Sequence, residues 1–99
     1  MSSFEALRSE HVRLAILKAL AADAGYSANE SILQGALQMY GLHISRDRVR
    51  TELRWLEEQG LVTVRDVSGY LVAMATGRGC DVAAGSARVD GVKRPGPRN

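Results

Sequence analysis

At 99 residues, of which 45% are apolar, the chain has the size and composition of one soluble domain with one core. Cys80 is the single cysteine, so no disulfide can form within the chain, and a lone thiol fits the reducing cytoplasm that we expect. The N-terminus lacks a basic region followed by an apolar run, and no apolar stretch approaches the roughly 18 residues that span a bilayer. We therefore expect neither a signal peptide nor a membrane partner.

The charge is unevenly distributed along the chain. Residues 1–45 hold three basic and four acidic side chains, whereas residues 46–99 hold ten basic and seven acidic ones. A basic second half is compatible with a polyanionic partner, although the net charge is only +2.

A first helix is predicted over residues 4–23, with Ser3 as its N-cap. Its apolar face is broad, and two interpretations remain open: the helix covers the core of its own domain, or part of it pairs with a second copy. Gly25 breaks this helix. The run Ser27-Ala28-Asn29-Glu30 predicts a capping box, with Ser27 as the N-cap of a second helix that ends near Tyr40. The buried stripe predicted for this second helix is Ile32, Leu33, Ala36, Leu37 and Tyr40.

A third helix is predicted from Ser45, its N-cap, to Gln59. Val49, Leu53 and Leu56 fall within about 60° of one another at 100° per residue, so they predict its buried stripe. Glycines fit the left-handed positions that end the second and third helices, at Gly41 and Gly60.

The chain then changes to strand periodicity. Residues 61–66 and 70–75 alternate and are rich in valine, and 67–69 supply a turn, so a hairpin is predicted. A last short helical segment follows, from Gly77 to about Ala84. Residues 85–99 contain two prolines and several basic side chains, which predicts a flexible basic tail after a domain of residues 1–84.

The order of these elements predicts a mainly α fold with a small β-hairpin: a winged helix-turn-helix with a three-helix core and a two-stranded wing. The helix from Ser45 to Gln59 is then the recognition helix, and double-stranded DNA is the expected partner. Arg50, Thr51 and Arg54 are the candidates for contacting bases, and Arg46 and Arg48 for contacting phosphates. Further phosphate contacts are predicted for Arg65 in the wing and for Lys93 and Arg94 in the tail. The alternative for the tail is an unstructured terminus that only improves solubility.

The alternative for the same helix is a solvated face held by salt bridges. Asp47 and Glu58 share the outward face and would repel phosphate, and Arg54 and Glu58 have the spacing of a helical ion pair. Trp55 lies beside the buried stripe, where it either packs between helix and wing or marks a partner surface.

No enzyme, cofactor or metal site is expected from the sequence. The chain has no glycine-rich phosphate loop, no activated nucleophile in a recognisable setting, and no acid pair that indicates a catalytic site. His11, His43 and Cys80 stand alone in the sequence, whereas a metal site needs three or four converging ligands.

Two runs resemble winged helix-turn-helix regulators of the arsenic-repressor-like and multiple-antibiotic-resistance-like types: Gly41 to Val64, with Leu53-Arg54-Trp55-Leu56-Glu57-Glu58-Gln59-Gly60, and Thr76 to Val82. The cysteine motif of arsenic sensors is absent from the chain. The whole chain, including Gly91-Val92-Lys93-Arg94-Pro95, is similar to a small protein of Mu-like phages and prophages. The resemblance favours a bacterial or prophage transcription regulator. A palindromic site would require a dimer, formed through the first helix and the region after the wing. A protein-interaction module, or a phage accessory protein without DNA contact, is the alternative.

Overall fold

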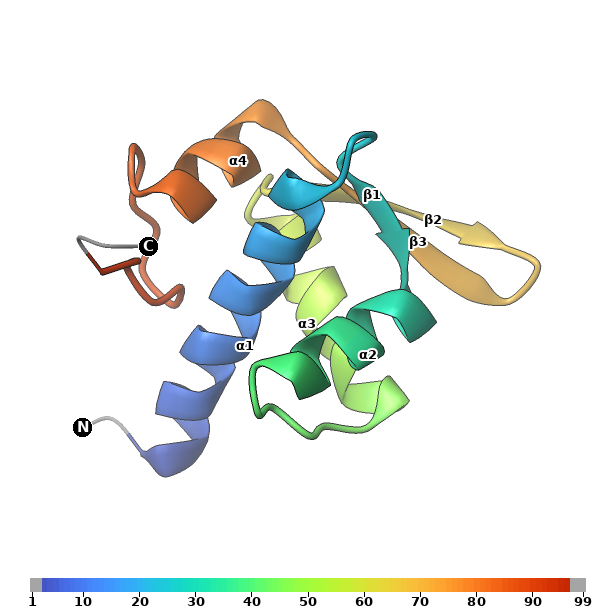
Figure 1. Cartoon of the computed structure of the whole chain (residues 1–99), viewed down its shortest axis with the longest axis horizontal. Helices are drawn as coiled ribbons and strands as arrows, with labels where there is room; N and C mark the ends of the chain where they lie inside the picture. Colours follow the sequence, from blue (N-terminus) through green and yellow to red (C-terminus); the bar gives the residue numbers. More distant parts are fainter. Residues whose placement is uncertain (1–2, 97–99) are drawn as a thin grey trace.

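The computed structural model describes residues 3–96, which form an α/β domain of four helices and one three-stranded antiparallel sheet (Figure 1). In chain order the elements are α1 (Phe4–Ala22), β1 (Ser27–Asn29), α2 (Glu30–Met39), α3 (Arg46–Glu58), β2 (Val62–Val67), β3 (Tyr70–Ala75) and α4 (Gly77–Ala84). The predicted order of helices and hairpin is confirmed, and β1 is an element that the sequence did not indicate.

Helices α1, α3 and α4 begin where the sequence predicts, each after a capping residue. The hydroxyl of Ser3 accepts from the amide of Ala6 at 3.0 Å, and that of Ser45 accepts from Arg48 at 3.0 Å. Thr76 caps α4 in the same way. Each of these contacts satisfies one of the backbone amides that a helix leaves without an internal partner.

The predicted capping box at Ser27 is wrong. Residues 27–29 form β1, which pairs antiparallel with β3 and places Ser27 opposite Met74. The N-cap of α2 is Asn29, whose side-chain oxygen accepts from the amide of Ile32 at 2.8 Å. The stripe of α2 is correspondingly narrower than predicted: Leu33 and Leu37 are buried, but Ile32 and Tyr40 are exposed.

The predicted two-stranded wing is part of a sheet in the order β1-β3-β2. Strand β3 is central at the base, where Met74 lies between Ser27 and Thr63. Beyond β1, strands β2 and β3 continue alone to a turn at Ser68 and Gly69, both with positive φ. This is the backbone conformation that suits the twist of a two-residue hairpin.

All four helices and the inner face of the sheet contribute to one core. Along β3 the burial alternates, with Leu71 and Ala73 inward and Tyr70 and Met74 exposed on the outer face. Complete burial of one leucine is worth about 1.5–3 kcal/mol, so this cluster supplies most of the driving force for folding. The largest fully buried apolar side chains are Val12, Ile16, Leu17, Leu20, Leu33, Leu37, Leu53, Leu56, Leu61 and Leu71.

The segment after α4 packs against the domain, so the predicted boundary at residue 84 is not where packing ends. It lies beside α1 (Figure 1), and the amide of Lys93 donates to the carbonyl of Glu10 at 3.2 Å. Val92 is buried, and Ala87 and Val89 are partly buried and pack on the core. Residues 97–99 of the predicted tail lie outside the described residues.

Trp55 contacts this segment, which corrects its predicted place between helix and wing. The guanidinium of Arg13 lies 3.8 Å from the centre of the indole ring, within the range of a cation–π interaction. The same guanidinium donates to the carbonyl of Gly91 at 2.9 Å. Trp55 therefore joins α3 to α1 and to the C-terminal segment.

Replacing Gly91 with alanine will detach the segment from Trp55. Gly91 has φ +96°, and a Cβ there would lie 2.7 Å from Cζ2 of Trp55. We expect a loss of about 1–3 kcal/mol in stability and a red shift of the emission of Trp55, the single tryptophan of the chain. Denaturant unfolding followed by tryptophan fluorescence measures both.

Gly41→Ala is the matched control. Its φ is +77°, and nothing in the described part of the chain lies within 4 Å of a Cβ at this position. It should lose stability through backbone strain alone and keep the native emission maximum. An unshifted emission maximum in Gly91→Ala would show that the segment does not hold the indole ring.

Candidate nucleic-acid interface

Three arginines of α3 project along the side that adjoins the hairpin. Arg46, Arg50 and Arg54 are spaced four residues apart, so they follow one another on successive helical turns. Their side chains are 43%, 38% and 53% exposed, respectively. This row contains one of the phosphate-contacting and two of the base-contacting candidates predicted from the sequence.

A buried carboxylate of α2 holds two of these arginines. Glu30 is only 1% exposed, and its Oε2 accepts from Nη1 of Arg50 at 2.7 Å. Nη1 of Arg46 lies 3.9 Å from Oε1 of the same carboxylate. Burial raises the pKa of Glu30, but the hydrogen bond from the amide of Leu71, the bond from Arg50 and the two positive charges together lower it. Glu30 is therefore ionised at neutral pH.

The bond from Leu71 explains why a carboxylate is buried at this position. Strand β1 ends at Asn29, opposite Val72, and the chain then turns into α2. The next amide on that edge of β3, that of Leu71, donates to Oε2 of Glu30 at 2.5 Å. The glutamate thus takes over the acceptor role of a strand that has ended.

The same arginines link α3 to the hairpin. Nη1 of Arg50 donates to the carbonyl of Gly69 in the turn at 3.4 Å, and the guanidinium of Arg46 lies 5.6 Å from the ring centre of Tyr70. Nε of Arg46 also donates to Oε1 of Gln34 at 3.3 Å. The helix, the hairpin turn and α2 are therefore joined around two guanidinium groups.

Thr51 and Arg54, which also face outward from α3, make weaker contacts. The hydroxyl of Thr51 donates to the carbonyl of Asp47 at 3.2 Å. Arg54 pairs with Glu57 at 3.0 Å, so its predicted pairing with Glu58 is wrong. An exposed pair of this kind is worth about 0.2–0.5 kcal/mol, which leaves Arg54 free to exchange partners.

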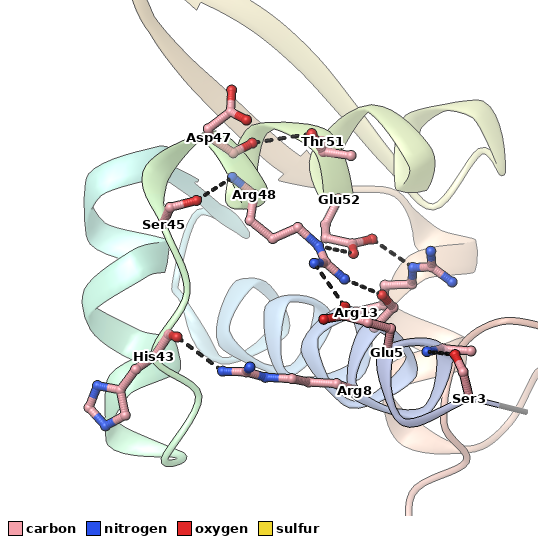
Figure 2. Close-up of polar contacts among 12 residues, drawn as sticks. Ser3, Glu5, Arg8, Arg13, His43, Ser45, Asp47, Arg48, Thr51 and Glu52 are labelled. Atoms are coloured by element: carbon pink, nitrogen blue, oxygen red, sulfur yellow. Dashed lines mark hydrogen bonds and ion pairs between the residues drawn. The ribbon is translucent and has the colours of Figure 1, made fainter.

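Arg48 points to the other side of α3, toward α1 (Figure 2). Nε of Arg48 donates to Glu52 at 2.9 Å, Nη1 pairs with Glu5 at 3.2 Å, and Nη2 donates to the hydroxyl of Ser9. The bond to Glu52 is the main reason that the pKa of Arg48 is raised. Arg13 pairs with the other oxygen of Glu52 at 2.7 Å. The structure thus places Arg48 in the junction between α1 and α3.

The other residues predicted to contact phosphate do not lie beside the row of Arg46, Arg50 and Arg54. Arg65 lies on the outer face of the sheet, opposite Val72. Lys93 and Arg94 belong to the C-terminal segment, which lies at the opposite end of the molecule from the hairpin tip (Figure 1).

Sequence reasoning missed the two buried glutamates, Glu30 and Glu52. A signal was present for Glu52, because its position on α3 lies about 40–60° from those of Val49 and Leu56 and therefore at the edge of the buried stripe. Glu30 carried no such signal, since its burial depends on strand β1.

Within residues 3–96, no three His, Cys, Asp or Glu side chains converge in a way that could hold a metal ion. None of the helices described here has the length and apolar character needed to cross a membrane.

These features define a small α/β domain in which an arginine-bearing helix is joined to a β-hairpin through a buried carboxylate.

The chain is 54% identical over 90 residues to protein gp26 of Escherichia phage Mu, covering 91% of this chain and 93% of gp26. It is 46% identical over 98 residues to a protein of Haemophilus influenzae, covering 98% of this chain and 95% of that protein. The chain therefore belongs to the family of phage Mu gp26. Both relatives are described as uncharacterized. No family model matches the chain, and no solved structure matches it.

Proposed function

We propose that the protein is a winged-helix regulator of Mu-like phages that binds double-stranded DNA, with α3 as recognition helix and the β2–β3 hairpin as wing. The observation that carries this proposal is the row Arg46, Arg50 and Arg54, which is partly exposed on one side of α3. Arg46 and Arg50 of this row also contact the hairpin. In helix-turn-helix proteins the second helix enters the major groove, where arginine can bind guanine through two hydrogen bonds.

The buried carboxylate of Glu30 supports the proposal that Arg50 contacts bases. An ionised Glu30 orients the guanidinium and leaves part of it exposed, so less side-chain entropy is lost when DNA binds. One negative charge on Glu30 lies between the two positive charges of Arg46 and Arg50, so this group of three side chains keeps one net positive charge.

The paired residue Arg48 is not part of the proposed surface. A phosphate contact there would require breaking its bonds to Glu52 and Glu5, which hold α3 against α1. Lys93 and Arg94 are also left out, because they belong to the C-terminal segment, which lies far from the hairpin tip (Figure 1). Arg65 is left out as well, because it lies on the outer face of the sheet. The proposed contacts are Arg46, Arg50, Thr51 and Arg54.

Two copies would have to associate to read a palindromic site, because the symmetry of such a site requires a symmetric dimer. The size of the complex on a selected duplex, measured beside the affinity, tests this part of the proposal.

Arg54→Ala combined with Thr51→Ala will weaken DNA binding by at least about tenfold, since each lost base contact costs roughly 1–3 kcal/mol. Neither residue is buried, so the fold should be retained. The probe is duplex DNA selected from a random-sequence pool at physiological salt. Fluorescence anisotropy at several salt concentrations gives the affinity and its salt slope, and the slope should change little because neither residue is a proposed phosphate contact.

Arg88→Ala is the matched control, because it removes one exposed positive charge from the C-terminal segment. It should leave the affinity for the selected duplex unchanged. The proposal is contradicted if selection yields no duplex with salt-dependent binding, or if the α3 variant binds as tightly as the unmodified protein.

The second candidate function is a protein-interaction module. The pairing of all four α3 arginines with carboxylates favours it, because each pair reduces the charge available to phosphate. Absence of DNA binding in the experiment above, with the protein folded, would favour this candidate.

A further inference from the structure

A groove runs along the side of α1 that faces away from α3. Two adjoining hollows, of about 370 and 400 Å³, share His11 and Leu42 in their walls. The lining begins at Phe4 and reaches Lys18, so the groove follows about 21 Å of α1, or four helical turns. This length suits a docked helix of about 14 residues.

The apolar part of the groove is unusually open to solvent. Phe4 is 76% exposed and Leu7 46%, while Leu14, Ala15 and Leu42 form a less exposed floor. Tyr40, which follows α2, lines one of the hollows and is also exposed. Exposed apolar side chains that gather along one groove indicate an interaction surface, whereas isolated ones do not.

The charged residues of the groove all have the same sign. Arg8, Lys18 and Lys93 line it, and no aspartate or glutamate does so among the described residues. An apolar floor with a basic rim is complementary to an amphipathic helix that carries acidic side chains beside its apolar stripe.

We propose that this groove binds an acidic amphipathic helix of another protein. The charge argues against a second copy of this chain, because a two-fold contact would bring two identical basic rims together. The groove involves α1, the end of α2 and Lys93, so its occupation does not depend on the α3 row or on DNA binding.

The test uses the full chain and a pair of synthetic helical peptides. One peptide has leucines at helical spacing and glutamates on both flanks, and the other has lysine in place of each glutamate. At low salt we expect the glutamate peptide to bind at least tenfold more tightly, roughly the effect of one or two good charge contacts. Binding is measured by the change in mobility of a fluorescent label on each peptide.

Two variants locate the site. Lys18→Glu should weaken binding of the glutamate peptide and strengthen that of the lysine peptide, a reversal that mere loss of structure would not produce. Leu7→Ser should weaken binding of the glutamate peptide without changing thermal stability much, since Leu7 is already half exposed. Ile32→Ser and Arg65→Glu are the apolar and charge controls, at exposed positions outside the groove, and should bind like the unmodified protein.

Three results would overturn the proposal. The first is equal binding, or no binding, of the two peptides. The second is a dimer in light scattering that Leu7→Ser abolishes, which would assign the groove to a second copy. The third is binding of phosphatidylglycerol vesicles in a Leu7-dependent manner while neither peptide binds, which would assign it to a lipid surface.

Discussion

Gly79→Ala will lower the midpoint of thermal unfolding by at least about 10 °C. A Cβ at this position would lie 2.0 Å from the carbonyl oxygen of Leu61 and 3.0 Å from its carbonyl carbon. Backbone atoms cannot move aside as a flexible side chain can, so α4 must shift away from the start of β2. Overpacking of this kind typically costs 1–3 kcal/mol and sometimes more, and about 3 kcal/mol corresponds to 12 °C or more in a domain of this size.

The shift would also affect the bonds that anchor α4. The hydroxyl of Thr76 donates to the carbonyl of Gly60 at 2.8 Å, and the amide of Thr76 donates to that of Leu61 at 3.0 Å. We expect scanning calorimetry to show the lower midpoint together with an unchanged fold at low temperature.

Gly77→Ala is the control within the same helix. A Cβ at Gly77 would meet nothing within 4 Å in residues 3–96, and the backbone there is not left-handed. Alanine should therefore leave stability unchanged or raise it by about 0.4–1 kcal/mol. Equal midpoints for the two alanine variants would refute the close approach of α4 and β2.

Glu30→Gln will destabilise the protein at neutral pH by about 2–3 kcal/mol. Removing one partner of a buried ion pair costs about 3–5 kcal/mol, and we place this case lower because Arg46 and Arg50 are partly exposed and can turn to water. The amide of Leu71 also loses a charged acceptor. Urea unfolding at pH 7 measures the difference in free energy.

The stability that the Glu30 carboxylate contributes should depend on pH. Because the pKa of Glu30 is lowered below its ordinary value of 4.5, the folded state favours the ionised carboxylate. Its contribution is therefore fully present above pH 4.5 and is lost as the pH falls through the lowered value in the folded protein. The difference between the unmodified protein and Glu30→Gln should be constant from neutral pH to about pH 5 and should shrink below that.

Glu58→Gln serves as the comparison, since Glu58 is exposed at the end of α3. It should change stability by less than about 0.5 kcal/mol at any pH. If Glu30→Gln behaves in the same way, the buried carboxylate does not hold Arg46 and Arg50 as the structure indicates.

Local signals were sufficient for most of the helices and for the hairpin. The caps at Ser3 and Ser45, the stripe at Val49, Leu53 and Leu56, and the turn at 67–69 each depend on residues a few positions apart. Such interactions can be read from spacing alone, because they involve one helix or one turn. Gly41 and Gly60 have the positive φ expected where helices end.

The missed features depend on residues far apart in the chain. Strand β1 has three residues and no periodicity of its own, and it exists because the edge of β3 supplies its hydrogen bonds. The packing of residues 85–96 likewise depends on Trp55 and Arg13, which the composition of the segment does not reveal.

The candidate site also has features that local sequence predicts and features that depend on tertiary contacts. The sequence by itself determined that α3 is a capped amphipathic helix with arginines on its outward side, because helical geometry fixes which positions share a face. Only the tertiary structure decided which arginines remain available. It turns Arg48 toward α1, and it buries Glu30 beneath Arg46 and Arg50. The physical reason is that a buried carboxylate needs charged partners, and those partners come from whichever helix and strand pack against it.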